Sequence, residues 1–205
     1  MKKIYLLMLL PLTSQAVTYT QTPNLLIPDN NLSGISSIIN VATSTPITGV
    51  EVTLDLSGVA SGGWSGDIYA YLIHGSGFSV LLNRIGRTAS ALDGSSNNSL
   101  VLTLSDGFTT DVHMASPTGA LSGNFQPDAR NIFPLSSLDT TPRTASLGVF
   151  SGDSSGDWTL FVADVASGGT MTLNSWSLTV NPVPEPSVAL LGVLSLSLAL
   201  RRRRG

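Results

Sequence analysis

Apolar and polar residues alternate along the middle of the chain. The clearest run is residues 47–57, where valine or leucine occupies every second position from Val50 to Leu56 and charged or polar residues lie between them. A period of two places one row of side chains in a core and the other in water, and no stripe with the 3.6-residue period of a helix competes with it. The pattern predicts a β-strand.

Seven further runs have the same character and are bounded by Gly, Ser, Asn, Asp or Pro. They are residues 34–41, 67–73, 78–83, 100–104, 147–150, 158–163 and 171–180. About eight or nine short strands joined by tight turns predict an all-β domain. We expect a jelly-roll-like antiparallel β-sandwich over residues 17–182.

Two stretches between these runs have weaker strand signals. Residues 84–99 are polar and rich in Ser and Asn, and residues 108–144 contain four prolines. We interpret both as long loops that cross the ends of the sandwich. Loops of this length commonly carry function, so we expect a binding surface there.

Residues 1–16 have the pattern of a secretion signal peptide. Lys2 and Lys3 precede a short apolar segment, residues 4–12, and small residues lie before a cleavage point that we place after Ala16. The alternative is a first core helix, but the apolar segment is short and polar residues follow it closely. The chain has no cysteine, so an exported domain would rely on packing, and on any metal it binds, instead of disulfides.

Residues 183–205 also have a membrane-associated pattern. Pro184, Glu185 and Pro186 precede an apolar run, residues 188–200, and the chain then has a basic cluster. The cluster consists of Arg201, Arg202, Arg203 and Arg204. As a helix the run covers roughly 20 Å, less than the ~30 Å of a bilayer core, so it spans a membrane only with help from flanking residues. The arginines would keep that end in the cytoplasm and leave the domain outside.

The order of proline–glutamate–proline, short apolar helix and arginine cluster resembles the PEP-CTERM sorting tail of Gram-negative bacteria that make extracellular polysaccharide. In that family a membrane transpeptidase, exosortase, is thought to recognise the Pro-Glu-Pro element and remove the helix. The resemblance implies an exported protein that is transiently anchored in the inner membrane and ends in the envelope or outside the cell. The alternative is a plain C-terminal anchor behind a proline-rich linker.

Charge is distributed unevenly. Residues 17–182 contain four arginines and no lysine, against twelve carboxylates. Nucleic acid is therefore an unfavourable partner, because neutralising phosphates requires a basic patch. Divalent cations are the natural partners of such an excess of carboxylates.

The order of landmarks over residues 27–180 resembles the P domain, or homo B domain, that follows subtilisin-like proprotein convertases and many secreted bacterial proteases. The matching segments are residues 27–30, 34–35, 47–50, 66–68, 72–77, 81–84, 156–160, 162–164 and 169–178. The resemblance implies a jelly-roll sandwich that packs on a protease and stabilises it. No protease domain precedes it in this sequence, so we do not carry over peptidase activity.

The three tryptophans have different contexts. Trp158 and Trp176 lie in predicted strands with apolar residues on the same face, which predicts that both pack in the core. Trp64 lies in a Gly- and Ser-rich turn and is the candidate ligand-binding residue. An exposed tryptophan there would stack on a sugar or contact a partner, and the alternative is that it folds back on its own domain.

Candidate catalytic motifs are weak, and we assign no catalytic residue. Residues 152–156 match the G-x-S-x-G spacing around Ser154, but a nucleophile elbow needs a following helix and here a strand is predicted. We interpret the segment as a polar hairpin loop. His74 and His113 are the two histidines, and neither has both an orienting carboxylate and a nucleophile in a recognisable sequence context.

Calcium is the candidate metal. Zinc is disfavoured by the absence of cysteine and the scarcity of histidine, whereas calcium takes carboxylate and carbonyl oxygens. Asp67, Asp106, Asp111 and Asp164 lie at predicted strand ends or adjoining turns, and the P-domain resemblance implies calcium near such positions. Aspartate is also a preferred turn residue, which is the structural alternative.

Together these patterns predict a non-catalytic, exported surface or matrix protein that acts by binding or adhesion. Two alternatives remain: a carbohydrate-binding module for extracellular polysaccharide, and a P domain that associates with a secreted protease in trans. Enzymatic activity through Ser154 is the least supported function.

Overall fold

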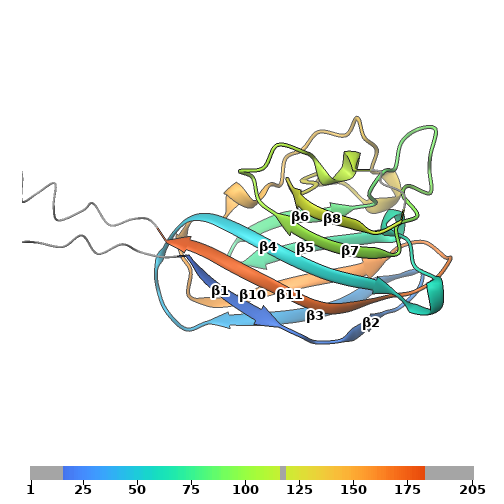
Figure 1. The fold of residues 1–205 in the computed structure, drawn as a ribbon. Helices are drawn as coiled ribbons and strands as arrows, with labels where there is room; N and C mark the ends of the chain where they lie inside the picture. Colours follow the sequence, from blue (N-terminus) through green and yellow to red (C-terminus); the bar gives the residue numbers. More distant parts are fainter. Residues whose placement is uncertain (1–15, 116–118, 183–205) are drawn as a thin grey trace, which may run out of the picture.

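The computed structural model describes residues 16–115 and 119–182, which form two β-sheets packed face to face (Figure 1). The larger sheet has the order β1-β11-β4-β7-β8, with β2 pairing with β11 and β9 pairing with β4. The smaller has the order β3-β10-β5-β6. The strands are β1 Val17–Gln21, β2 Leu25–Ile27, β3 Asn31–Val41, β4 Pro46–Gly58, β5 Ile68–His74, β6 Gly77–Asn83, β7 Ser99–Leu104, β8 Leu121–Phe125, β9 Gly152–Asp153, β10 Gly156–Asp164 and β11 Met171–Pro182.

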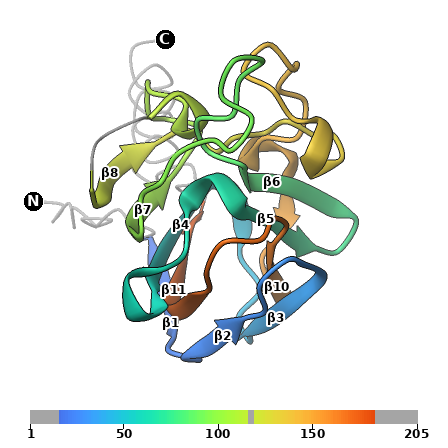
Figure 2. The same ribbon diagram turned by 90° about the vertical axis from the view of Figure 1, so that its right-hand side faces the viewer.

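The predicted all-β sandwich is confirmed. The chain crosses from one sheet to the other between β2 and β3, β3 and β4, β4 and β5, β6 and β7, β9 and β10, and β10 and β11, which gives the jelly-roll-like wrapping visible end-on in Figure 2. All pairings are antiparallel except that of β7 with β8, which is parallel. Residues 1–15 of the predicted signal peptide and the predicted sorting tail, with Pro184, Glu185, Pro186 and Arg201–Arg204, lie outside the described residues. Within the described ranges, no helix is long and apolar enough to cross a bilayer.

The core lies between the two sheets and follows the alternating pattern. In β4, Val52, Leu54 and Leu56 are fully buried. Trp158 and Trp176 are buried as predicted, and each indole nitrogen has a partner: Nε1 of Trp158 donates to the Ser154 carbonyl at 2.9 Å and Nε1 of Trp176 donates to the Ser37 hydroxyl at 2.9 Å. Burying large rings with satisfied N–H groups stabilises a domain that has no disulfides.

One strand prediction and two loop predictions need correction. Residues 147–150 do not form a strand but include a 3₁₀ turn, Leu147–Val149, whose first two amides donate to the Asp106 carboxylate. Because this segment is not a strand, residues 152–156 are not a hairpin loop, and β9 pairs with β4 instead. The predicted loop 108–144 contains β8, which pairs with β7.

The long loops lie on a different side of the sandwich from the one expected. Instead of crossing its ends, they gather along the side formed by β6, β7 and β8 (Figures 1 and 2). Backbone hydrogen bonds attach one of them to β6: the amide of Asp128 donates to the Leu81 carbonyl, and the amide of Val80 donates to the Ala145 carbonyl. The loop residues 126–145 therefore extend the edge of the smaller sheet.

Candidate functional site

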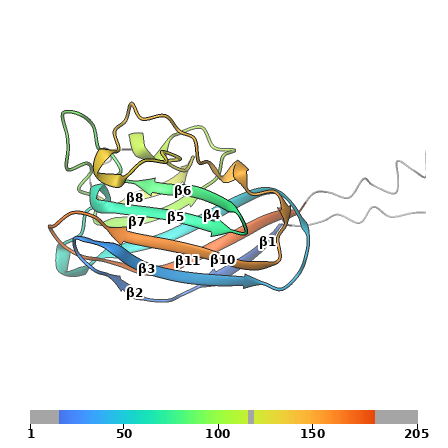
Figure 3. The ribbon, with the colours of Figure 1, turned by 180° about the vertical axis from the view of Figure 1, so that it is seen from behind.

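An aromatic cluster covers part of the outer face of the smaller sheet, which faces the viewer in Figure 3. Ala70 and Leu72 of β5 are fully buried in the core, so Tyr69 and Tyr71 project from the opposite face. Tyr71 stacks on Phe161 of the neighbouring β10, with ring centroids 4.6 Å apart and an interplanar angle of 14°. The ring centroid of Phe78 of β6 lies 5.1 Å from that of Tyr71. Aromatic rings from three strands therefore form one cluster.

Gly34 of β3 makes room for this cluster. Its φ is +50°, and a Cβ atom at this position would lie 2.7 Å from Cζ of Phe161 and 2.4 Å from the Val162 carbonyl oxygen. Any side chain would therefore be strained and would displace the ring. The glycine fixes how closely β3 approaches the aromatic face.

Beside this cluster lies a groove of about 600 Å³, which we call the outer groove. Its floor is formed by the sheet and its wall by the loop that follows Arg130. The floor residues are Leu32, Ser33, Tyr69, Tyr71 and Phe161, and the wall residues are Asn131, Ile132, Phe133 and Pro134. Leu32 and Phe133 are 52% and 54% exposed. None of these described lining residues is charged, although the domain as a whole is acidic.

The wall of the outer groove is attached to the sheet by Asn83, the last residue of β6. Its Nδ2 donates to the carbonyl oxygens of Arg130 at 2.9 Å and Ile132 at 3.1 Å. Its backbone amide donates to Oδ2 of Asp128 at 3.2 Å. Asn83 is fully buried, so these bonds are shielded from competing water.

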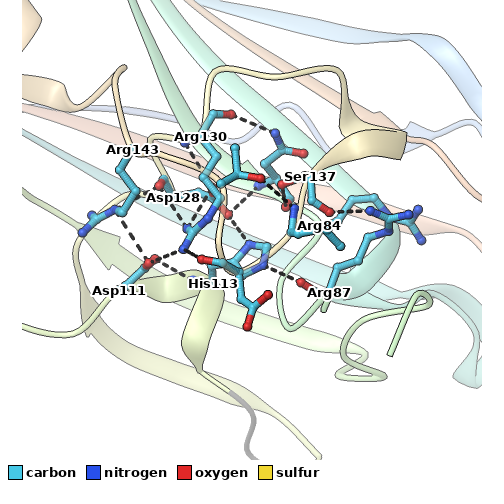
Figure 4. A network of polar contacts seen from close by, with 12 residues as sticks. Arg84, Arg87, Asp111, His113, Asp128, Arg130, Ser137 and Arg143 are labelled. Carbon is cyan, nitrogen blue, oxygen red and sulfur yellow. Dashed lines mark hydrogen bonds and ion pairs between the residues drawn. The ribbon is translucent and has the colours of Figure 1, made fainter. Parts of the chain in front are cut away.

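Behind the wall lies a buried polar network, which we define as Asp111, His113, Asp128 and Arg130 (Figure 4). Nδ1 of His113 lies 2.7 Å from Oδ2 of Asp128, and its Nε2 lies 2.9 Å from the carbonyl oxygen of Arg87. Burial alone would lower the pKa of His113, but the hydrogen bond and negative charge of Asp128 outweigh it and raise that pKa above its ordinary value.

Arg130 connects the two carboxylates of the network. Its guanidinium lies 2.9 Å from Oδ2 of Asp111 and 3.3 Å from Oδ1 of Asp128. Arg143 adds a longer contact of 3.7 Å to Asp111, and an Arg87 guanidinium nitrogen donates to the Ser137 carbonyl. The network therefore joins the loops predicted at residues 84–99 and 108–144, but the sequence alone did not reveal its pairing.

The four aspartates predicted to bind calcium do not come together. Asp106 caps the 3₁₀ turn Leu147–Val149 through the amides of Leu147 and Gly148. Asp111 caps another, Val112–Met114, and also pairs with Arg130. Both have the structural role that aspartate commonly has in turns.

Asp67 and Asp164 lie close together where β5 begins and β10 ends. Asp67 lies 3.5 Å from the Arg84 guanidinium. Burial, partly offset by Arg84, raises the pKa of Asp67 to about 6. Burial also raises the pKa of Asp164 to about 7, with further contributions from the charges of Asp67 and Asp29, and Oδ2 of Asp164 has no hydrogen-bond partner among the described residues. No group of three or more metal-ligating side chains is found in residues 16–115 and 119–182, so calcium stays a prediction that now concerns this pair.

The remaining candidates from the sequence, Trp64, Ser154 and His74, lie outside the outer groove and the polar network. Trp64 is 41% exposed and precedes the 3₁₀ turn Ser65–Asp67, and it does not line the outer groove. Ser154 is fully buried, and its hydroxyl donates to the Thr43 carbonyl and accepts from the Thr45 amide. His74 stacks on Trp158 with 4.0 Å between ring centroids, and both of its ring nitrogens lie within 3.0 Å of backbone carbonyl oxygens.

Comparisons with known proteins give limited information. No family model matches the sequence. No curated protein matches it either. Two solved structures show a weak similarity: the serine protease of Aeromonas sobria, at 19% identity and a TM-score of 0.42, and the same protease in complex with its chaperone, at 18% identity and a TM-score of 0.41. The matches cover 82% and 83% of this chain but only 27% of each listed chain. At this level of similarity neither structure indicates a function.

Proposed function

We propose that this protein is a non-catalytic, exported binding module that docks on an apolar patch of a secreted or envelope protein through the outer groove. The observation that carries the proposal is the composition of the groove. Its lining is largely aromatic and aliphatic and has no charged residue, on a domain whose residues 17–182 contain four arginines against twelve carboxylates. Protein interfaces have this composition at their centres, where aromatic residues are enriched and charges are depleted. A secreted protease is the partner class that the P-domain resemblance favours.

The geometry of the rings favours a protein partner over a glycan. Sugars stack on free aromatic faces, but one face of Tyr71 is occupied by the stacked ring of Phe161, and Phe78 lies beside it at a tilt of 43°. Next to these rings the groove offers exposed apolar side chains, Leu32 and Phe133. Such a surface complements apolar side chains of another protein.

Export and sorting are the second part of the proposal. The pattern of residues 1–16 supports secretion, and the pattern of residues 183–205 supports anchoring and processing by an exosortase-type enzyme. The mature protein would then act in the cell envelope or outside the cell. Intact mass of the protein recovered from its own host tests this part, because unprocessed ends would contradict it.

The docking surface is tested by two aspartate substitutions on the same face of the molecule. Phe133→Asp places a charge in the groove wall, whereas Ile38→Asp places one at an exposed β3 position, 50% exposed, that does not line the groove. The purified full-length chain and both variants are immobilised and exposed to the secreted proteins of the host. We expect a protein that binds the wild type and Ile38→Asp but not Phe133→Asp. Equal binding to all three would refute the groove as the docking site.

A carbohydrate-binding function is the second candidate, and it rests on the exposure of Trp64. An indole in a turn with part of its surface in water is able to stack on a sugar ring. Binding to a glycan array that disappears in Trp64→Ala but persists in Phe133→Asp would favour this function over protein docking.

A further inference from the structure

The hydrogen-bond partners of His113 determine its protonation state. The carbonyl oxygen of Arg87 only accepts, so Nε2, at 2.9 Å, must carry a proton. Asp128 also accepts from three donors besides the imidazole: the amide of Asn83 and the amide and guanidinium of Arg130. Because these donors converge on both oxygens of Asp128, Nδ1 of His113, at 2.7 Å, faces an acceptor and must carry a proton as well. His113 is therefore a buried imidazolium, 1% exposed.

The charges around His113 come from every described segment packed against it. Asp128 and Arg130 face it from the loop that carries the groove wall, and Asp111 accepts a hydrogen bond from its backbone amide. Arg87 faces it through its backbone carbonyl, and Arg143 contacts Asp111 from the outer side (Figure 4). The cationic imidazole and Arg130 together balance the two buried carboxylates.

Loss of the proton would leave two acceptors facing each other. A lone pair on Nδ1 would point at the Asp128 carboxylate, or one on Nε2 would point at the Arg87 carbonyl, and either arrangement leaves a buried polar group unsatisfied. This cost affects the groove through Asp128, because Oδ2 of Asp128 also accepts a hydrogen bond from the Asn83 amide. The next residue, Ala129, has a φ of +59°, a conformation that a non-glycine residue keeps only when its surroundings hold it.

We infer that protonated His113, acting through Asp128 and Asn83, is the positioning residue for the wall of the outer groove, and that the wall detaches when this proton is lost. The inference deepens the proposed function and rests on it only for the biological meaning of the groove. The direction of the pH dependence is defined. The stability that protonated His113 gives to the wall is fully present below pH 6.5, the ordinary histidine pKa. It is lost as the pH rises through the higher pKa of the folded state. The groove would thus be complete in neutral or mildly acidic surroundings and loosened in alkaline ones.

The test measures the imidazole and the wall separately, in the full-length protein without any partner. Nitrogen-15 NMR reports whether both ring nitrogens of His113 carry protons at pH 7. Hydrogen exchange, read as protection factors for the amides of residues 130–133, reports the wall from pH 7 to pH 9.5. Residues 52–56 of β4, at the centre of the larger sheet, serve as the internal reference. We expect two ring protons at pH 7. Between the ordinary histidine pKa of 6.5 and the higher pKa of His113 in the folded protein, we expect about a tenfold loss of wall protection per pH unit, as one linked proton requires, and no further loss above the folded-state pKa.

Two variants complete the experiment. His113→Gln should lower wall protection at pH 7 and make it independent of pH, while Glu51→Gln, an outward-facing change on β4, should leave it unchanged. A single protonated nitrogen at pH 7, or wall protection that stays constant while His113 titrates, would overturn the inference, and both can be measured on the wild type alone. Failure of the proposed function is a separate result, since it would show as partner binding that is insensitive to Phe133→Asp.

Discussion

Replacing Asp164 with asparagine should stabilise the protein at alkaline pH and change its stability little at pH 4.5. Asp164 is fully buried at the end of β10, its Oδ1 accepts the Ala166 amide at 3.3 Å, and its Oδ2 has no partner among the described residues. Burial raises its pKa from 3.8 to about 7. Ionising this group in the folded protein is therefore unfavourable, and asparagine keeps the shape without the charge.

The sign and size follow from proton linkage. Unfolded chains lose the Asp164 proton near pH 3.8, whereas the folded protein keeps it until about pH 7. The unfolded state therefore binds fewer protons in this range, and stability falls as the pH rises from 4 to 7. One pKa unit corresponds to about 1.36 kcal/mol, so the full shift amounts to roughly 4 kcal/mol at pH 8.5, an upper bound because the site can relax.

Urea unfolding followed by tryptophan fluorescence measures this prediction. Trp158 and Trp176 are buried, so their emission reports loss of the core. The free energy of unfolding is compared between wild type and Asp164→Asn at pH 4.5 and 8.5, with Glu51→Gln as the control for a change in net charge. The reasoning is wrong if wild type and Asp164→Asn lose the same free energy between the two pH values, or if the variant is equally destabilised at both.

The other predictions concern calcium, catalysis and sugar binding. If calcium binds at Asp67 and Asp164, a calcium concentration of a hundred times its dissociation constant should add about 2.7 kcal/mol to the free energy of unfolding at pH 8.5. Asp164→Asn should abolish this increase, and an unchanged melting temperature of the wild type would refute calcium binding there. Ser154→Ala should lose about 1 kcal/mol of stability, because it removes the hydrogen bond that the buried Ser154 hydroxyl accepts from the part-buried Thr45 amide, and casein hydrolysis that depends on Ser154 would contradict the non-catalytic proposal. Trp64→Ala should leave the melting temperature within a few degrees of wild type, since its ring is 41% exposed, and a large decrease would show that Trp64 packs on its own domain.

The sequence was sufficient to predict the strands in which buried and exposed residues alternate. In β4 every second residue from Val50 to Leu56 is buried, and in β11 the alternation is broken only by a bulge between Leu173 and Ser175, so local alternation was sufficient. It was insufficient for β1, which has no buried residue and is held by distant partners such as the 2.8 Å hydroxyl contact between Thr18 and Thr179. The same holds for β8, where Leu121 is buried but the next three residues are exposed.

The outer groove and the polar network were harder to predict, because each is assembled from separate segments. Two signals were present in the sequence. Tyr69 and Tyr71 occupy positions of a predicted strand that should face water, and all four interior arginines lie in or beside the two predicted long loops. Neither signal identifies the contact between His113 and Asp128, which are fifteen residues apart and meet only after the loop folds back on β6.

The antiparallel pairing of β1 with β11 has a mechanical consequence. Val17 lies opposite Val180, so the first and last strands leave the sandwich side by side, while the outer groove lies toward the opposite end of the smaller sheet (Figure 1). A pull between the two ends of the domain would unzip β1 from β11 one hydrogen bond at a time. A pull between the groove and the end of β11 would instead act parallel to the strands. It would put the hydrogen bonds between β11 and β4 under shear, so that many of them must break together. The domain is therefore weak when stretched between its own ends and strong along the line from its groove to its last strand.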